Sequence, residues 1–210
     1  MQDEIDLVNE CSQKLVTYFG EIRKPDAKTV TLKSPEELRK TYSDAGVALS
    51  LADGKPHTNG DLAKAVDLTL ENSVRTDAPA FHNQLYGRSE APGLVGQFVS
   101  SSIGGATHTF EVAPVFTVME RECVDKIKAV ANFPENSDGL FCPGGSMGNM
   151  YGIHLARWKK YGDRIKKEGL FNMKPMCIFV SAHAHYSYLK AMSFLGLGTD
   201  NCIKVEEKFP

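Results

Sequence analysis

The sequence has no excess of basic residues and no long apolar run. Its 210 residues include 24 Lys+Arg against 26 Asp+Glu, which gives a net charge of -2 at pH 7. A chain with this balance offers no broad positive surface to a phosphate backbone, so we expect no nucleic acid partner. The longest apolar runs, such as 177–180, fall far short of the roughly 20 residues that cross a bilayer, and we expect no membrane span.

Disulfide and metal motifs are also missing. The cysteines are odd in number and show no CxxC spacing; they are Cys11, Cys123, Cys142, Cys177 and Cys202. The N-terminal segment MQDEIDLVNE is acidic, whereas a signal peptide begins with basic residues. These features favour the reducing environment of the cytoplasm. No GxSxG, HExxH or paired-carboxylate motif occurs, and we expect no metal site.

The first half of the chain has the pattern of a helical segment. Apolar residues spaced by three and four predict an amphipathic helix from Glu4 to Phe19, which needs a surface to dock on. Ser34, Pro35 and Glu37 have the order of an N-cap, a first-turn proline and a capping-box partner, so a second helix is expected to run to about Leu51. Further helices are predicted over 61–72, 94–103 and 114–130.

After Gly139 the pattern changes to alternating strands and helices. Short apolar segments at 140–142, at Met176 to Val180 and at 201–207 are separated by helical patterns at 150–162 and 188–196. This alternation predicts α/β units on a mostly parallel sheet. Two or three strands are too few for a sheet that is covered on both faces, so this α/β part is expected to be incomplete.

The most specific local signal is the segment FCPGGSMGN at 141–149. A strand, a glycine turn and a helix in this order let backbone N–H groups and the positive helix end approach a phosphate, and Ser146 adds a hydroxyl donor. No lysine follows the glycines, so this is not a P-loop. A glycine-rich connection with Ser146 as an ordinary N-cap is the alternative. Cys142 has no base partner by spacing and favours a structural role over a nucleophilic one.

A second signal is SAHAHYS at 181–187, directly after an apolar strand. Ligands of α/β sheets lie beyond the carboxyl ends of the strands, so His185 is placed to stack on a cofactor ring or to bond it. His183 and His185 face the same way in an extended chain, but no third metal ligand lies at a recognisable spacing. Ser187 is expected to cap the following helix.

A third signal is the loop segment Asn83-Gln84-Leu85-Tyr86-Gly87. Amides bond a carboxylate without adding a charge, and an adjacent aromatic ring sets the size of a pocket. The alternative is that these amides satisfy the backbone of the loop.

Taken together, FHNQLYG, TFEVAPVFTVMERE, GLFCPGGSMGNMYGIHLAR, SAHAHYS and FLGLGTDN resemble, in this order, the group II pyridoxal-phosphate-dependent amino-acid decarboxylases. The resemblance runs from about Ala80 to Val205 and points to the glutamate, aspartate and cysteine sulfinate branch. It implies an α/β fold, the PLP-dependent transferase fold type I (aspartate aminotransferase-like), here truncated. It also implies a helical N-terminal segment at 1–75 and an incomplete cofactor-binding large domain at 76–210.

The resemblance also implies roles for individual residues. Gly145 and Ser146 match the positions that hold the phosphate of pyridoxal 5'-phosphate, and His185 matches the catalytic histidine that stacks on the pyridine ring. Gln84 and Tyr86 match substrate-binding positions. An aromatic residue at position 86 shortens the pocket, which favours cysteine sulfinate or aspartate over glutamate. The implied activity is decarboxylation of an acidic amino acid, through a Schiff base on the cofactor, by a homodimer when the protein is complete.

The 210 residues depart from the family pattern in several places. The family's His-Pro before the loop is Ala78-Pro79, its second Phe is His82, and residues ahead of the HYS motif are Ala182 and Ala184. The Asn-Pro-His-Lys motif of the Schiff-base lysine and the Asp-Ala-Ala-Trp motif are absent, and both are expected beyond Pro210. Lys190 does not match the family lysine.

Because of these missing groups, we expect the chain alone to be inactive. The alternative function is a non-catalytic truncated product that pairs with a full-length subunit or another protein. An unrelated phosphate-binding α/β protein is a third possibility and would require the motif order to be a coincidence.

Overall fold

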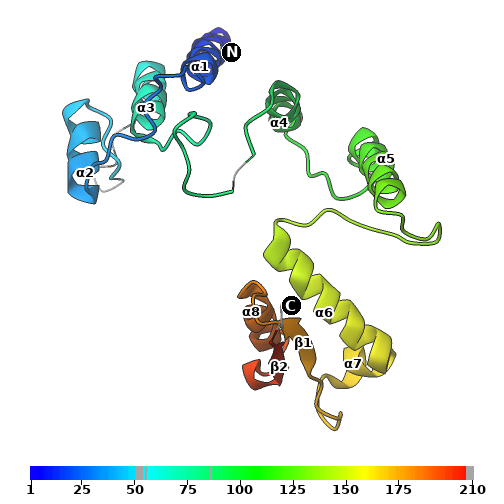
Figure 1. Cartoon of the computed structure of the whole chain (residues 1–210). Helices are drawn as coiled ribbons and strands as arrows, with labels where there is room; N and C mark the ends of the chain where they lie inside the picture. The colour runs from blue at the N-terminus through cyan, green and yellow to red at the C-terminus, as the bar shows by residue number, and fades with distance from the viewer. Residues whose placement is uncertain (51–53, 55, 86, 207–210) are drawn as a thin grey trace. The chain divides into compact units, whose positions relative to one another are not determined.

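The chain divides into two compact units, Met1–Gly104 and Gly105–Pro210. The computed structural model describes residues 1–206 apart from 51–53, 55 and 86 (Figure 1). Each unit has its own packing and is considered by itself. The division expected at residues 75 and 76 concerns the domains of the family and stays a prediction.

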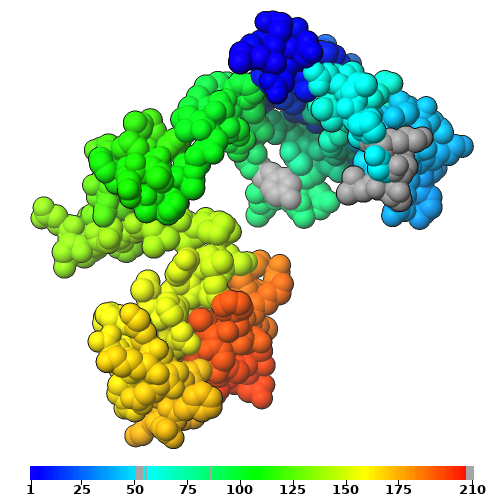
Figure 2. Space-filling model, turned by 180° about the vertical axis from the view of Figure 1, so that it is seen from behind, coloured from blue at the N-terminus to red at the C-terminus, as the bar shows by residue number. Residues whose placement is uncertain are grey.

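Unit 1 consists of helices joined by irregular segments. They are α1 (Gln2–Glu21), α2 (Pro35–Asp44), α3 (Asn59–Asn72) and α4 (Ala91–Ile103). The predicted amphipathic first helix is confirmed, and it docks on α3, which also contacts α2. Figure 2 shows α1, in blue, beside α3, in cyan. An ion pair joins the two helices, with Lys14 Nζ 2.7 Å from Asp67 Oδ2.

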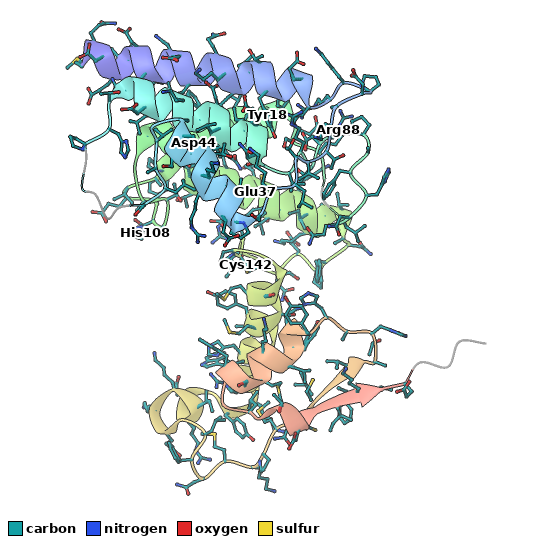
Figure 3. The ribbon with its side chains drawn as sticks, turned by 90° about the vertical axis from the view of Figure 1, so that its left-hand side faces the viewer. Tyr18, Glu37, Asp44, Arg88, His108 and Cys142 are labelled. Atoms are coloured by element: carbon teal, nitrogen blue, oxygen red, sulfur yellow. The ribbon has the colours of Figure 1, made fainter. Side chains whose placement is uncertain are left out.

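Local capping decides where the helices of unit 1 begin. The predicted capping box of α2 is present: the Glu37 N–H donates to Ser34 Oγ at 3.2 Å, and the Ser34 N–H donates to Glu37 Oε2 at 2.7 Å. Figure 3 labels Glu37 at this end of the helix. A second capping box, formed by Thr58 and Asp61, begins α3. The backbone N–H and hydroxyl of Thr58 both donate to the Asp61 carboxylate and hold its pKa below the usual value.

The second helix is shorter than predicted. It ends at Asp44 rather than near Leu51. Gly46 adopts a φ of +79°, the left-handed conformation that closes a helix, and its N–H donates to Ser43 O at 2.9 Å. The expected extension to Leu51 is therefore wrong, because the glycine turn ends the helix before the apolar residues that follow it.

Unit 2 contains the α/β part of the chain. Its elements are α5 (Pro114–Val130), α6 (Gly145–Tyr161), α7 (Asp163–Glu168), β1 (Ile178–Ser181), α8 (Ser187–Phe194), the 3-10 turn η1 (Thr199–Asn201) and β2 (Cys202–Val205). The two strands are parallel, with Ile178 opposite Cys202 and Ser181 opposite Val205. Helix α8 lies between them in the chain, so β1, α8 and β2 form the predicted parallel α/β unit.

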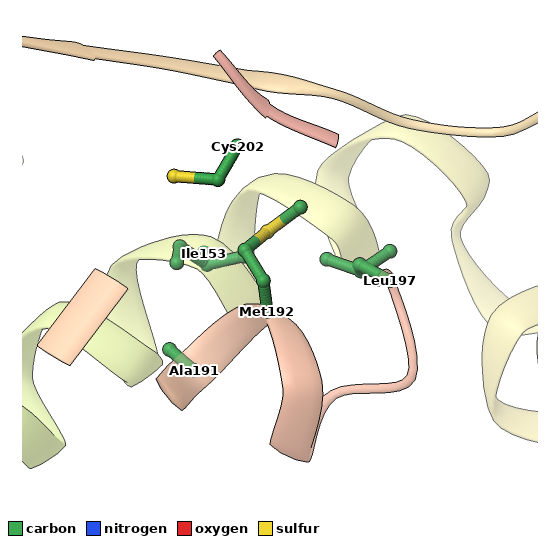
Figure 4. Packing of buried hydrophobic residues seen from close by; sticks show 5 residues of the cluster. All are labelled: Ile153, Ala191, Met192, Leu197 and Cys202. Carbon is green, nitrogen blue, oxygen red and sulfur yellow. The ribbon is translucent and has the colours of Figure 1, made fainter. Parts of the chain in front are cut away.

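The core of unit 2 lies where α8 packs against α6 and the strand β2. Met192 on α8 is fully buried, and Figure 4 shows its side chain between those of Ile153 and Leu197. Ala191 and Cys202 complete this buried cluster. In Figure 2 the segment from β1 to β2, in orange and red, packs on the yellow segment that contains α6 and α7. This packing fixes the start of α6 relative to the start of α8.

The strand predicted at 140–142 is wrong. These residues are irregular, and the side chains of Leu140 and Phe141 are 61% and 57% exposed. A strand needs a neighbour to pair its backbone groups, and the Phe141 N–H instead donates to the Glu120 carboxylate on α5 at 3.2 Å. In the described part of the chain, no helix is long and apolar enough to cross a membrane.

Candidate functional site

The glycine turn places the start of α6 at the surface of unit 2. Gly144 precedes the helix with a φ of +94°, which a residue with a side chain rarely adopts. Gly145 and exposed Ser146 are then the first two residues of the helix. The interpretation of Ser146 as the N-cap is therefore wrong, since Gly144 holds that position. The first amide groups of a helix lack partners within it, and they give this end partial positive charge.

The space in front of this turn is open. A side-chain carbon at Gly144, Gly145 or Gly148 would meet no other group within 4 Å. A ligand can therefore approach the backbone closely. Open amide groups, a positive helix end and the Ser146 hydroxyl together suit an anion such as a phosphate.

His185 lies between β1 and α8, as the sequence predicted, and its ring is exposed. The Ser187 N–H donates to His185 Nδ1 at 3.2 Å. Because Nδ1 accepts this bond, the neutral ring carries its proton on Nε2. The His185 and Tyr186 ring centroids are 4.2 Å apart, with the rings tilted by 32°. The imidazole of His185 is thus held at Nδ1 by the Ser187 N–H and remains exposed to solvent.

A buried hydroxyl connects α6 to this histidine. Ser187 is 1% exposed, and its Oγ accepts a hydrogen bond from Asn149 Nδ2 on α6 at 2.8 Å. The expected cap by Ser187 is wrong, because Tyr186 holds the N-cap position and Ser187 begins the helix. Sequence reasoning missed Asn149, although it lies three residues after Ser146 and so near it on the helix surface.

A groove of about 290 Å³ runs between α6 and α8. Ser146 and Ser187 both line it, together with Met147, Met150, Lys190, Ala191 and Phe194. The Lys190 ammonium lies 4.5 Å from the centroid of the Tyr186 ring, a cation–π contact. Ser146 in the first turn of α6 and Ser187, whose N–H donates to His185, therefore line one groove of unit 2.

The segment before the turn is tied to α5. The carboxylate of Asp138 accepts from the Gly139 N–H at 2.8 Å and from Arg121 Nη1 at 3.0 Å. These bonds hold the pKa of Asp138 below its usual value, the Gly139 N–H having the larger effect. The segment 138–141 is thus held to α5 by the ion pair of Asp138 with Arg121 and by the bond from the Phe141 N–H to Glu120, rather than by strand pairing.

The two predicted substrate-binding positions lie elsewhere in the chain. Gln84 is exposed in the irregular segment of unit 1 between α3 and α4, and Tyr86 lies outside the described residues. The roles of Gln84, Tyr86, Gly145, Ser146 and His185 stay predictions. Within the ranges that the structure describes, no three His, Cys, Asp or Glu side chains are grouped as metal ligands.

A conserved-domain comparison decides the family. The pyridoxal-dependent decarboxylase conserved domain matches residues 46–210. The chain belongs to this family. It is 36% identical over 187 residues to cysteine sulfinic acid decarboxylase of Homo sapiens, which covers 86% of this chain and 36% of that protein. It is 38% identical over 180 residues to acidic amino acid decarboxylase GADL1 of Bos taurus, which covers 85% of this chain and 33% of that protein. The chain thus spans about a third of the length of these relatives.

Solved structures confirm the fold that the resemblance implied. The crystal structure of mouse CSAD matches with a TM-score of 0.88 and 32% identity, over 97% of this chain and 42% of that chain. Its apo form matches with a TM-score of 0.90 and 31% identity, over 99% of this chain and 42% of that chain. The glutamate decarboxylase domain of a Vibrio parahaemolyticus protein, at 20% identity and a TM-score of 0.79, shares the fold. The chain is a partial, mostly helical portion of the PLP-dependent fold type I.

Pyridoxal phosphate is the cofactor that the pyridoxal-dependent decarboxylase family implies. The residues of unit 2 fit such a group. The open glycine turn at the start of α6 suits its phosphate, and the exposed imidazole of His185 offers a flat face to an aromatic ring.

Proposed function

We propose that the complete protein is a pyridoxal-phosphate-dependent decarboxylase of an acidic amino acid. The observation that carries this is the open turn at Gly144, Gly145 and Ser146, linked through the groove and Ser187 to His185. Family membership supports the reaction type. The names of the relatives support acidic substrates, with cysteine sulfinate, aspartate and glutamate as the candidates.

The cofactor phosphate would be held at the start of α6. The amide groups of Gly145 and Ser146 and the Ser146 hydroxyl are the donors for it, and the positive end of the helix favours its charge. His185 would lie against the cofactor ring, held in one tautomer by the Ser187 N–H. When bound, pyridoxal phosphate supplies an electron sink for the charge left on the substrate as carbon dioxide departs.

The substrate side is assigned to the loop of unit 1. Gln84 would donate its amide to the acidic group of the substrate, which fixes orientation without adding a charge. Tyr86 would set the length of the pocket and favour the shorter acids, cysteine sulfinate and aspartate. We place this activity in a cytoplasmic homodimer of the complete protein.

The 210-residue chain contains no Asn-Pro-His-Lys motif. Without the lysine of that motif, the cofactor would be held by phosphate contacts and ring stacking alone, and exchange of substrate onto it would be lost. We therefore expect weak cofactor binding and no turnover by this chain alone.

The test compares the complete protein with the 210-residue chain. Carbon dioxide release from cysteine sulfinate, aspartate and glutamate is measured across a titration of pyridoxal phosphate. Activity of the complete protein on at least one acid, with none from the short chain, supports the proposal. A complete protein that releases no carbon dioxide from any of the three overturns it. A short chain that persists in cells bound to a full-length subunit would support the non-catalytic alternative for that chain.

A further inference from the structure

Asp77 is a buried carboxylate in unit 1, with its side chain 2% exposed. It lies just after α3, where the irregular segment that carries Gln84 begins. Its Oδ2 accepts from Arg23 Nη2 at 2.7 Å. The Ser89 N–H donates to both carboxylate oxygens at 3.2 and 3.1 Å, and the Ser89 hydroxyl donates to Oδ1 at 3.4 Å. The charge is therefore paired, and the carboxylate accepts bonds from two distant parts of the chain.

Arg23 lies two residues after the end of α1 and contacts both Asp77 and Ser89. Its guanidinium also donates to Ser89 O and to Phe19 O, and it lies 3.4 Å from the centroid of the Phe19 ring. One planar group thus contacts Asp77 and Ser89 while it is held by the last turn of α1. A guanidinium is suited to this because its donors are fixed in one plane, whereas an ammonium is a point charge. We call Arg23, Asp77 and Ser89 the loop clamp.

The loop clamp joins the two ends of the segment 78–88. The chain leaves Asp77, passes through Gln84 and returns to Ser89, so its ends are held together as in an Ω-loop. Figure 3 labels Tyr18, in the last turns of α1, and Arg88, the residue before Ser89. Inside the segment the Phe81 N–H donates to Ala78 O at 2.9 Å. Fixing both ends of a loop removes much of the conformational freedom of the residues between them.

We infer that the loop clamp positions Gln84 for the substrate of the proposed reaction. This inference rests on the proposed function. Arg23 and Asp77 are positioning residues: they act through the loop, at its base. Removing one partner leaves a buried charge unpaired, which opens the base of the loop and spreads Gln84 over several orientations. Since the glycine turn that we propose for the cofactor phosphate belongs to unit 2, the loss should fall on substrate binding rather than on cofactor binding.

The experiment uses the complete protein and the variants Arg23→Gln and Asp77→Asn. Asp77→Asn keeps an acceptor for Ser89 and removes the charge that faces Arg23, so it perturbs the fold least. Hydrogen exchange of the amides in 78–88 reports the order of the loop without reference to activity. Steady-state kinetics give KM and kcat for the preferred acid, and a titration gives the affinity for pyridoxal phosphate. Lys14→Gln is the matched control, because Lys14 makes an α1 ion pair of the same 2.7 Å length away from the loop.

We expect both variants to exchange faster in 78–88 and to raise KM by about tenfold, the rise expected if Gln84 holds the binding orientation about a tenth of the time. The affinity for the cofactor should stay unchanged, and Lys14→Gln should match the parent. Arg23→Lys keeps the charge but not the planar fork, and it should restore exchange and KM only in part.

Three results would overturn the inference. Unchanged exchange in 78–88 would show that the clamp does not order the loop. Faster exchange with an unchanged KM would show a purely structural role. A loss confined to kcat or to cofactor affinity would show that the loop clamp does not act through substrate binding. Failure of the proposed function is distinguishable, since the unmodified protein would then decarboxylate none of the three acids.

Discussion

Ser146 contributes a hydroxyl to the first turn of α6, next to backbone amides that also face the solvent. Ser146→Ala in the complete protein removes that donor and leaves the backbone of the turn in place. A hydrogen bond to a charged group contributes about 1.5 to 3 kcal/mol, so the affinity for pyridoxal phosphate should fall roughly ten- to 150-fold. A fluorescence titration of the cofactor measures this.

The control for that variant is Ser102→Ala. Ser102 is an exposed serine of α4 whose hydroxyl donates to Phe98 O in its own helix. It should leave the cofactor affinity unchanged. Equal affinities for Ser146→Ala and the parent would remove the hydroxyl from the phosphate site.

On our proposal, Tyr86 determines whether the pocket prefers a shorter or a longer acidic substrate. Tyr86→Ser enlarges the pocket and should shift preference toward glutamate, the longer acid. One methylene group in a pocket changes discrimination by about 1 to 3 kcal/mol, or roughly ten- to 200-fold in the ratio of kcat/KM values. Competition between glutamate and cysteine sulfinate gives this ratio directly. An unaltered ratio would exclude Tyr86 as the selector.

At the scale of the element, the bond from Asn149 to buried Ser187 adds to the apolar packing of α6 against α8. Asn149→Ala leaves the buried hydroxyl without its donor and should lower the free energy of unfolding by about 1 to 3 kcal/mol. It should also loosen His185, which accepts from the Ser187 N–H. Denaturant unfolding of the complete protein measures the first effect.

Asn72→Ala is the control for the α6–α8 bond, since the Asn72 side chain donates within its own helix, to Leu68 O. It should change stability less than Asn149→Ala. Equal losses in the two variants would show that the bond between α6 and α8 adds nothing beyond an ordinary helix contact.

Elements were predictable where the signal was local. The capping box of Ser34 and Glu37 and the first-turn Pro114 act within one turn, so the starts of α2 and α5 follow from the sequence. The box of Thr58 and Asp61 was missed because its residue at position N3 is Asp rather than Glu or Gln.

Two of the errors arose where a distant partner decides the structure. The segment 140–142 has the composition of a strand, but the Phe141 N–H is taken by Glu120 on another helix. The hydroxyl of Ser187 suggested a cap, yet the packing of α8 against α6 turns it toward Asn149. Of the candidate site, the glycine turn and the position of His185 were predictable. The bond from Asn149 to Ser187 was not, because it crosses between α6 and α8.

At the scale of the whole molecule, large apolar side chains remain at the surface of both units. On α4 and α5 they are Leu94, Val95, Phe98, Val99, Ile103, Val115, Val118, Met119, Ile127 and Val130, each at least 42% exposed. Such surfaces drive association in water. We therefore expect the isolated 210-residue chain to form oligomers or aggregates at micromolar concentration.

Light scattering coupled to size-exclusion chromatography measures this association. The double variant Phe98→Asp and Val118→Lys should reduce the mean mass, while Lys126→Glu, also on α5, serves as a control that exchanges one charge for another. A chain that elutes as a monomer at all concentrations would contradict the expectation.

The contacts of His185 also indicate when its ring orientation forms during folding. Ser187, whose N–H donates to the imidazole, and Tyr186, whose ring contacts it, lie within two residues of His185 in the chain. Contacts between residues close in sequence cost little loop-closure entropy and form early. The orientation of the imidazole is thus established by neighbours in the chain, as a fast local event, and does not wait for the slower assembly of distant segments.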